Sequence, residues 1–254
     1  YMIGMSHFGP LPGDPRCRRD YRAEQMAEAM GRDVEALQEG GVDAVMFSNE
    51  GSQPWLLENP QATLCAMAHM IGILKRNLRI PFGVHVIWDA KSTIELAVAT
   101  GADFAWEAYT GAYASDYGLW DTEEGEYARM MRALSARGVK RLCEILPEAA
   151  KPIGGRALED ALRTTGRTMD FYAYCIAGLQ PGVPPPLELL KKARATGKRC
   201  FASTGMNGEN IGAYLPYLDG AIIGSAFKRD GMLFQPVDGE RVKRFMELVK
   251  KEEN

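Results

Sequence analysis

Short apolar runs alternate along the chain with segments in which apolar residues recur every three or four positions. The runs predict β-strands at Met2–Met5, Asp43–Phe47, Phe82–Val86, Phe104–Glu107, Lys140–Ile145, Phe171–Cys175, Arg199–Ser203 and Ala221–Gly224. Between the first two, the spacing of Met26, Met30, Val34 and Leu37 places four apolar side chains on one face of a helix. The same periodicity predicts helices at Ala62–Leu78, Ala90–Thr100, Glu123–Arg137, Ala157–Thr165, Pro186–Thr196, Glu209–Leu218 and Gly239–Lys250.

The number and order of these elements predict the fold. About eight strand–helix units within 254 residues are typical of an α/β protein with a (β/α)8 TIM barrel, because an open doubly wound sheet needs fewer strands. Gly41 and Gly101 each end a predicted helix just before a strand, where glycine suits the left-handed residue. The proline-rich stretch 181–186 is short and predicts a stiff loop rather than a linker. We therefore expect a single TIM-barrel domain over residues 1–254.

Three glutamates lie at the ends of predicted strands. In a TIM barrel the strand ends and the loops after them open onto one mouth, where the chemistry takes place. Glu50 follows the second strand, Glu107 ends the fourth and Glu144 lies near the end of the fifth. Desolvation would raise the pKa of Glu50 and make it a general base, with Glu107 or Glu144 as the second acid–base group. A solvated loop position for Glu50, and ion pairs for the other two, are the alternatives.

Two of the three histidines fall on the same rim. His7 and His85 lie on the first and third strands, and alternate strands fill the same interior layer of a barrel. We expect them to take part in acid–base chemistry or to bind the substrate. If the site holds a divalent metal, His7, His85 and Glu50 are its candidate ligands, although their spacing is not a metal signature.

Other polar residues on the rim are candidate substrate contacts. They are Asn49, Asp89, Tyr109 and Asp116. The last two belong to a segment of about residues 108–122 that is long for a barrel loop and rich in aromatic residues. Such a loop is often a lid or a binding segment, and packing against the rim is the alternative.

The loops after the seventh and eighth strands are rich in glycine. Their candidate phosphate-binding residues are Gly205, Gly208, Gly224 and Ser225. Glycine leaves backbone N–H groups free to point at an anion, and TIM barrels commonly bind phosphate in these two loops. The alternative is that these residues only form turns.

Several motifs together resemble the BtpA/SgcQ family. They are the residues IGMSHFGPLPG at 3–13, LQEGGVD at 37–43, IPFGV at 80–84, ATGADF at 99–104, DGAIIGSAFKRDG at 219–231 and PVD at 236–238. The resemblance covers nearly the whole chain and implies a TIM barrel of the ribulose-phosphate-binding type, in which phosphorylated small molecules are typical ligands. One branch of the family is named for photosystem I biogenesis, and another resembles products of carbohydrate-utilisation operons. The chain departs from the family pattern at Trp106-Glu107, where many members have Arg and Asn, and at Glu148-Ala149, where many have Lys and His.

Composition excludes several classes of partner and cofactor. Lys and Arg number 30 against 33 for Asp and Glu, and this net charge of -3 favours neither nucleic acid nor an anionic membrane. No apolar run reaches the roughly 18 residues of a membrane span. The five cysteines are scattered, which is typical of reduced thiols in a cytoplasmic protein. Neither a dinucleotide fingerprint nor a lysine placed for a Schiff base is present, so the sequence requires no cofactor and leaves a divalent metal open.

Two functions are consistent with these features. The first is an enzyme that acts on a small phosphorylated metabolite, such as a sugar phosphate, by carboxylate acid–base chemistry as an isomerase, epimerase or lyase. The second is a non-catalytic assembly or regulatory factor that binds a ligand or a partner. In either case we expect a homo-oligomer, because barrels of this size often assemble through their outer helices.

Overall fold

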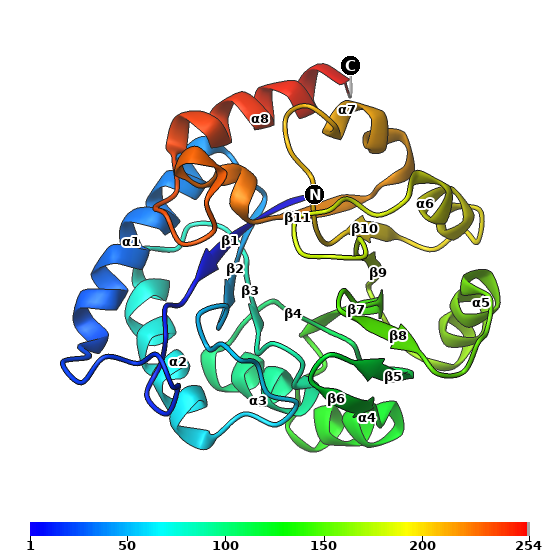
Figure 1. Ribbon diagram of the computed structural model, residues 1–254, viewed down its shortest axis with the longest axis horizontal. Helices are drawn as coiled ribbons and strands as arrows, with labels where there is room; N and C mark the ends of the chain where they lie inside the picture. Colours follow the sequence, from blue (N-terminus) through cyan, green and yellow to red (C-terminus); the bar gives the residue numbers. More distant parts are fainter. Residues whose placement is uncertain (253–254) are drawn as a thin grey trace.

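The computed structural model describes residues 1–252, in which eight parallel strands form a closed barrel (Figure 1). In order around the barrel the strands are β1 (Met2–His7), β2 (Ala44–Ser48), β3 (Phe82–His85), β4 (Phe104–Glu107), β7 (Lys140–Leu146), β9 (Ala173–Ile176), β10 (Cys200–Ala202) and β11 (Gly220–Ile223). β1 pairs with both β2 and β11, which closes the ring. The predicted (β/α)8 TIM barrel is confirmed.

Helices surround the barrel on its outer side (Figure 1). They are α1 (Ala23–Gly40), α2 (Gln61–Leu74), α3 (Ala90–Thr100), α4 (Glu124–Ala133), α5 (Leu158–Thr168), α6 (Leu187–Arg194), α7 (Ile211–Tyr214) and α8 (Gly239–Glu252). The helix predicted at Glu209–Leu218 is much shorter than expected. α7 continues only as the 3-10 turn η2 (Leu215–Tyr217). Pro216 lies at the start of this turn, and proline has no N–H with which to extend an α-helix.

The interior of the barrel is apolar near the starts of the strands and polar near their ends, where the mouth lies. Its lower layers contain Ile3, Met46, Phe104, Leu142 and Phe201, all of them buried. Gly83 makes room for Phe104, because a Cβ atom at Gly83 would lie 2.1 Å from the Phe104 ring. Since alternate residues of a strand face the same side, the next inward positions after Met46, Leu142 and Phe201 are the polar residues Ser48, Glu144 and Ser203. The pattern therefore brings polar groups together at one end of the barrel.

A small antiparallel sheet covers part of the mouth. Its strands, in spatial order, are β6 (Gly118–Asp121), β5 (Ala112–Ser115) and β8 (Ala150–Pro152). The long loop predicted over about residues 108–122 contains a hairpin that the sequence did not indicate, in which β5 and β6 pair. Four-residue strands are too short for a clear alternation of apolar and polar residues. Tyr113 and Trp120 are buried on the inner face of the sheet, which makes it a packed wall of the mouth.

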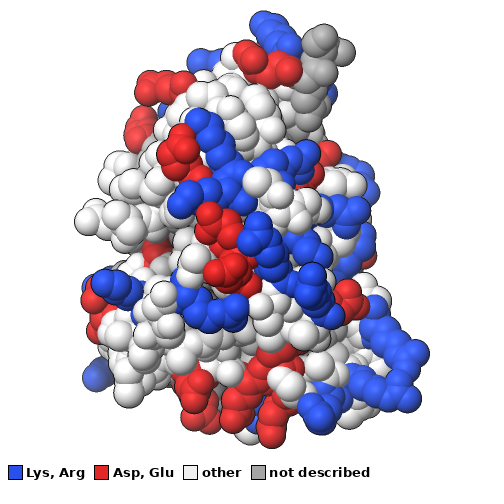
Figure 2. Space-filling model, turned by 90° about the vertical axis from the view of Figure 1, so that its right-hand side faces the viewer, with Lys and Arg blue, Asp and Glu red and all other residues white. Residues whose placement is uncertain are grey.

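The outer surface has no face of a single charge in the view of Figure 2. Basic and acidic side chains are interspersed over the helices on that side. Exposed ion pairs of opposite charge include Lys191–Glu188 on α6 and Arg163–Asp160 on α5. Among residues 1–252, no helix is both long enough and apolar enough to cross a membrane.

Candidate functional site

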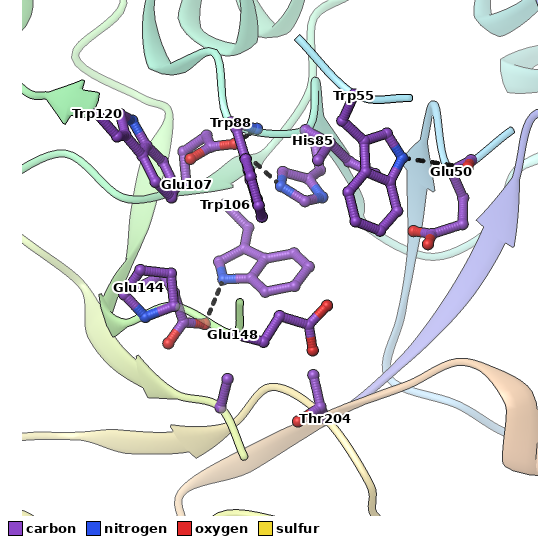
Figure 3. Close-up of a pocket in the computed structure, with 13 residues that line it drawn as sticks. Glu50, Trp55, His85, Trp88, Trp106, Glu107, Trp120, Glu144, Glu148 and Thr204 are labelled. Carbon is purple, nitrogen blue, oxygen red and sulfur yellow. Dashed lines mark hydrogen bonds and ion pairs between the residues drawn. The ribbon is translucent and has the colours of Figure 1, made fainter. Parts of the chain in front are cut away.

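Two adjoining hollows lie at the mouth of the barrel. The first, which we call the tryptophan chamber, is lined by Trp55, Trp88, Trp106 and Trp120 and has a volume of about 470 Å³ with its opening to solvent (Figure 3). The second, the glycine pocket, has a volume of about 810 Å³ on the same basis, and its lining includes His7, Ser203, Gly205, Gly224 and Ser225. The residues that line both hollows are Glu50, Trp106, Glu148 and Thr204. The mouth is therefore one site with two compartments.

Three carboxylates project into the mouth from different loops and strands. Glu50 follows β2, Glu144 lies in β7 and Glu148 follows β7. Burial raises the pKa of Glu50 to about 7, with a further contribution from the neighbouring charge of Glu148. Burial also raises the pKa of Glu148 to about 7 and that of Glu144 to about 8. Each group can therefore gain or lose a proton near neutral pH, which general acid–base catalysis requires.

Glu107 has a structural task at the mouth. Its Oε1 accepts hydrogen bonds from the backbone N–H of Trp88 and from His85 Nε2 at 3.1 Å, and its Oε2 accepts one from the backbone N–H of Ala108 at 2.6 Å. Trp88 has a positive φ of 65°, which is unfavourable for a bulky residue. Glu107 thus holds the loop after β3 in a strained conformation, and neither oxygen is free for the acid–base role that the sequence suggested.

The two histidines lie in one interior layer, since the strand register aligns His7 with Ser48 and Ser48 with His85. His85 Nδ1 lies 3.3 Å from the Ser48 hydroxyl, so both of its ring nitrogens have partners. His7 packs against Gly224, and its buried Nδ1 has no partner among the described residues. Burial, together with the charge of Lys228, lowers the pKa of His7 to about 3. His7 is therefore neutral at physiological pH, and its Nδ1 is available to a ligand.

The proposed metal ligands do not form a coordination group. Within residues 1–252, no cluster of three or more His, Cys, Asp or Glu side chains is placed to hold a metal ion. His85 already uses both ring nitrogens, so it cannot join His7 and Glu50 around an ion without losing those bonds. Among the described residues His7, His85 and Glu50 therefore do not form a ready coordination group.

Two predicted substrate contacts brace loops instead. Asn49 accepts a hydrogen bond from the backbone N–H of Ile87 at 2.8 Å and donates one to Asn59 at 3.3 Å. Asp89 caps α3 by accepting from the backbone N–H of Ser92 at 2.9 Å, and its other oxygen accepts from the backbone N–H of Asn59 at 2.7 Å. Both side chains fix the loops after β2 and β3.

The other two predicted contacts lie away from both hollows. Tyr109 is fully buried in the apolar layer outside the barrel wall, where its ring stacks on Phe171 with centroids 6.0 Å apart. Asp116 is exposed at the turn between β5 and β6. Tyr109 lies two residues beyond Glu107, the last residue of β4, and its side chain faces outward. Asp116 lies at the tip of the β5–β6 hairpin, which the sequence did not predict.

The glycine-rich loops meet at the glycine pocket, with one exception. Gly205, Gly224 and Ser225 line it, whereas Gly208 is exposed outside it. Gly205 has a φ of 74°, and a Cβ atom there would lie 2.2 Å from the backbone nitrogen of Pro184, so only glycine fits. Ser225 begins the 3-10 turn η3 (Ser225–Phe227), whose first amides have no acceptor within the turn.

The sequence interpretation did not identify Glu148 or the tryptophan cluster as parts of the site. All four tryptophans of the chain line the chamber. Trp88 stacks on Trp120 with ring centroids 5.3 Å apart, and Trp106 lies 4.2 Å from the His85 ring. The sequence did contain a signal for the tryptophan cluster, because every tryptophan falls at or after the end of the second, third or fourth strand. Glu148 entered the interpretation only as a departure from the family pattern.

Comparisons with known proteins agree with this architecture. The model of the BtpA family matches residues 1–251. The chain is 42% identical over 250 residues to the putative sgc region protein SgcQ of Escherichia coli, covering 98% of this chain and 93% of that protein. It is 31% identical over 253 residues to the photosystem I biogenesis protein BtpA of Synechocystis sp., covering 98% and 87%. The crystal structure of phosphoribosyl anthranilate isomerase from Thermus thermophilus has a TM-score of 0.60 at 13% identity and covers 99% of both chains, which shows a shared fold.

Proposed function

This chain belongs to the BtpA family, and from that premise we propose that it is an enzyme acting on a small phosphorylated metabolite, such as a sugar phosphate. The reaction class is isomerisation, epimerisation or lyase cleavage by acid–base chemistry at the mouth of the barrel. One observation carries the proposal. Glu50 and Glu148, both with a pKa of about 7, line the space that joins the tryptophan chamber to the glycine pocket.

The two carboxyl groups have complementary tasks in this proposal. Both pKa values are about 7, and the charge of Glu148 contributes to that of Glu50, so near pH 7 the pair holds about one proton. The ionised member, Glu50, removes a proton from the substrate, and the protonated member, Glu148, donates one to a substrate oxygen. Glu144 lines the same chamber, and the charge of Glu148 contributes to the raised pKa of Glu144. Glu148 thus takes the place of Glu107 or Glu144, which the sequence suggested as the second acid–base group.

The glycine pocket supplies the phosphate end of the substrate site. Gly205, Gly224 and Ser225 belong to the loops after the seventh and eighth barrel strands, where TIM barrels commonly bind phosphate. The fold shared with phosphoribosyl anthranilate isomerase, whose name denotes an isomerase of a phosphoribosyl compound, also supports this assignment. A phosphate held there places the rest of a small substrate beside Glu50 and Glu148.

A solvent-exchange experiment tests the proposal. The protein is incubated with a panel of sugar phosphates in deuterated water, and NMR follows deuterium incorporation and product formation. We expect one compound to exchange, and Glu50→Gln to slow this exchange by roughly 10²- to 10⁴-fold, the usual contribution of a general base. Thermal shift with inorganic phosphate should still show binding by this variant, since Glu50 does not hold the phosphate.

The matched control is Glu58→Gln, which neutralises an exposed glutamate in the loop that also carries Glu50. It should leave the exchange unchanged. Normal exchange in Glu50→Gln would remove Glu50 from the mechanism. If no phosphorylated compound stabilised the protein, the enzyme proposal would be wrong, and the non-catalytic role suggested by the name of the Synechocystis relative would be favoured.

A further inference from the structure

The walls of the mouth carry acidic and aromatic groups together with two histidines, of which His7 is neutral at physiological pH. Glu50, Glu144 and Glu148 line it together with the four tryptophans, and no lysine or arginine lines either hollow. Lys228, whose charge acts on His7, is only 2% exposed and pairs with Asp33 at 2.8 Å instead of lining the glycine pocket. A charged group of a ligand that enters the mouth therefore lies beside carboxyl groups rather than beside a lysine or an arginine.

Two carboxylate oxygens in the mouth have no partner. Trp106 donates its indole N–H to Glu144 Oε2 at 3.3 Å, which holds that side chain in place. The other oxygen of Glu144 and one oxygen of Glu148 are buried without a hydrogen bond of normal geometry among the described residues, although the Ser203 hydroxyl is near enough to Glu144 to oppose the rise of its pKa. Glu144 is only 5% exposed, so bulk water does not readily satisfy its free oxygen. A buried polar atom without a partner is costly, and a ligand group that donates hydrogen bonds removes that cost.

The arrangement around these oxygens favours a positively charged donor. Figure 3 shows the Trp106 indole in the middle of the chamber, with the carboxyl groups of Glu50, Glu144 and Glu148 around it. An ammonium group donates N–H bonds to carboxylates and is also attracted to the face of an indole ring. A neutral hydroxyl group can make the hydrogen bonds but lacks the charge that both the rings and the carboxylates attract.

The charge of a phosphorylated ligand leads to the same conclusion. A sugar phosphate without a cationic group would add negative charge to a mouth that already contains three carboxyl groups and that no lysine or arginine among residues 1–252 lines. A positive nitrogen on the same molecule would offset that repulsion where the carboxylates lie. The two compartments thus match a ligand with opposite charges at its two ends.

We propose that the tryptophan chamber binds a protonated amine and that the substrate is an amino sugar phosphate. Its ammonium group lies against Trp106 and donates to the free oxygens of Glu144 and Glu148, while its phosphate occupies the glycine pocket. The phosphate end of this assignment rests on the proposed function, whereas the amine end rests on the chamber.

Tryptophan fluorescence measures this binding directly, because all four tryptophans of the protein line the chamber. The protein is titrated at pH 7 with hexosamine 6-phosphates, each paired with its neutral hexose 6-phosphate and with its N-acetylated form. The pairs are those of glucosamine, mannosamine and galactosamine. We expect at least one amine to bind 10-fold or more tightly than its neutral counterpart, and N-acetylation, which removes the charge, to abolish the preference.

The variant Glu144→Gln keeps the size of the side chain and cannot ionise, whereas Glu144, with a pKa of about 8, ionises when a bound ammonium group stabilises its charge. It should lose the preference for the amine while it keeps the affinity for the neutral hexose 6-phosphate. Glu58→Gln, the exposed control, should retain the preference. Preference for the amine in Glu144→Gln equal to that of the unaltered protein would refute the role of this carboxylate.

The titrations separate this inference from the proposed function. Equal binding of amine and neutral compounds would refute the amine site and leave the phosphate site standing. Binding of unphosphorylated glucosamine, with no gain from its phosphate, would support the amine site and refute the phosphate site. Absence of a fluorescence change with every compound would refute both.

Discussion

Replacement of Glu144 by glutamine should stabilise the protein increasingly as the pH rises. Glu144 is 5% exposed, and burial raises the pKa of its carboxyl group from 4.5 to about 8. Because the folded-state pKa lies above the unfolded value, the folded protein binds more protons between these two pH values. The stability contribution of protonated Glu144 is therefore fully present below pH 4.5 and is lost as the pH rises through about 8.

The size of the effect follows from the same pKa values. At about 1.4 kcal/mol per pH unit, the loss reaches roughly 3 kcal/mol at pH 7 and roughly 5 kcal/mol above pH 8. Glutamine cannot ionise and escapes this loss, and its carbonyl oxygen can still accept from the Trp106 indole. Its NH₂ group lacks a clear acceptor, which costs about 1–2 kcal/mol. We expect a net gain of about 1–2 kcal/mol at pH 7 and a net loss of up to about 1 kcal/mol at pH 5.

Urea unfolding of both proteins at pH 5, 7 and 8.5 measures this difference. The decisive result is the trend, because a packing effect of the substitution would be the same at each pH. A difference that does not grow with pH, or a variant less stable than the unaltered protein at pH 8.5, would show that Glu144 is not a buried carboxyl with a raised pKa. Glu58→Gln, an exposed substitution, should change the stability by less than about 0.5 kcal/mol at every pH.

Three further predictions concern other residues of the mouth. Glu148→Gln should remove the limb of the pH–rate profile that belongs to Glu148 and shift the limb of Glu50 to lower pH, because the charge of Glu148 helps to raise the pKa of Glu50. An unshifted Glu50 limb would show that the two groups do not interact. Glu107→Gln should lower the unfolding free energy by about 1–3 kcal/mol, since an amide cannot accept all the hydrogen bonds that hold Trp88, and denaturant unfolding with tryptophan fluorescence would detect it. Gly205→Ala should weaken binding of inorganic phosphate in thermal shift, because an alanine there meets a neighbouring backbone; unchanged binding would place the phosphate elsewhere.

The barrel could be predicted from local patterns. Strand alternation, helical periodicity and glycine at helix ends repeat in every unit, and a parallel barrel is the arrangement that buries eight such units. The rim position of Glu50, Glu144, His7 and His85 followed from the same rule, because strand ends share one mouth. The β5–β6 hairpin was missed, since two four-residue strands give too weak a period to distinguish from a loop.

The sequence by itself determined which residues reach the mouth, because that depends on their position along each strand. Only the tertiary structure decided what they do there, since hydrogen bonds and burial depend on neighbours from other strands. Glu107 and Glu144 both lie in strands at the mouth, yet both oxygens of Glu107 are occupied by a loop and one oxygen of Glu144 is free. The tryptophans, scattered from residue 55 to residue 120, likewise form one chamber only because the barrel brings three strand ends together.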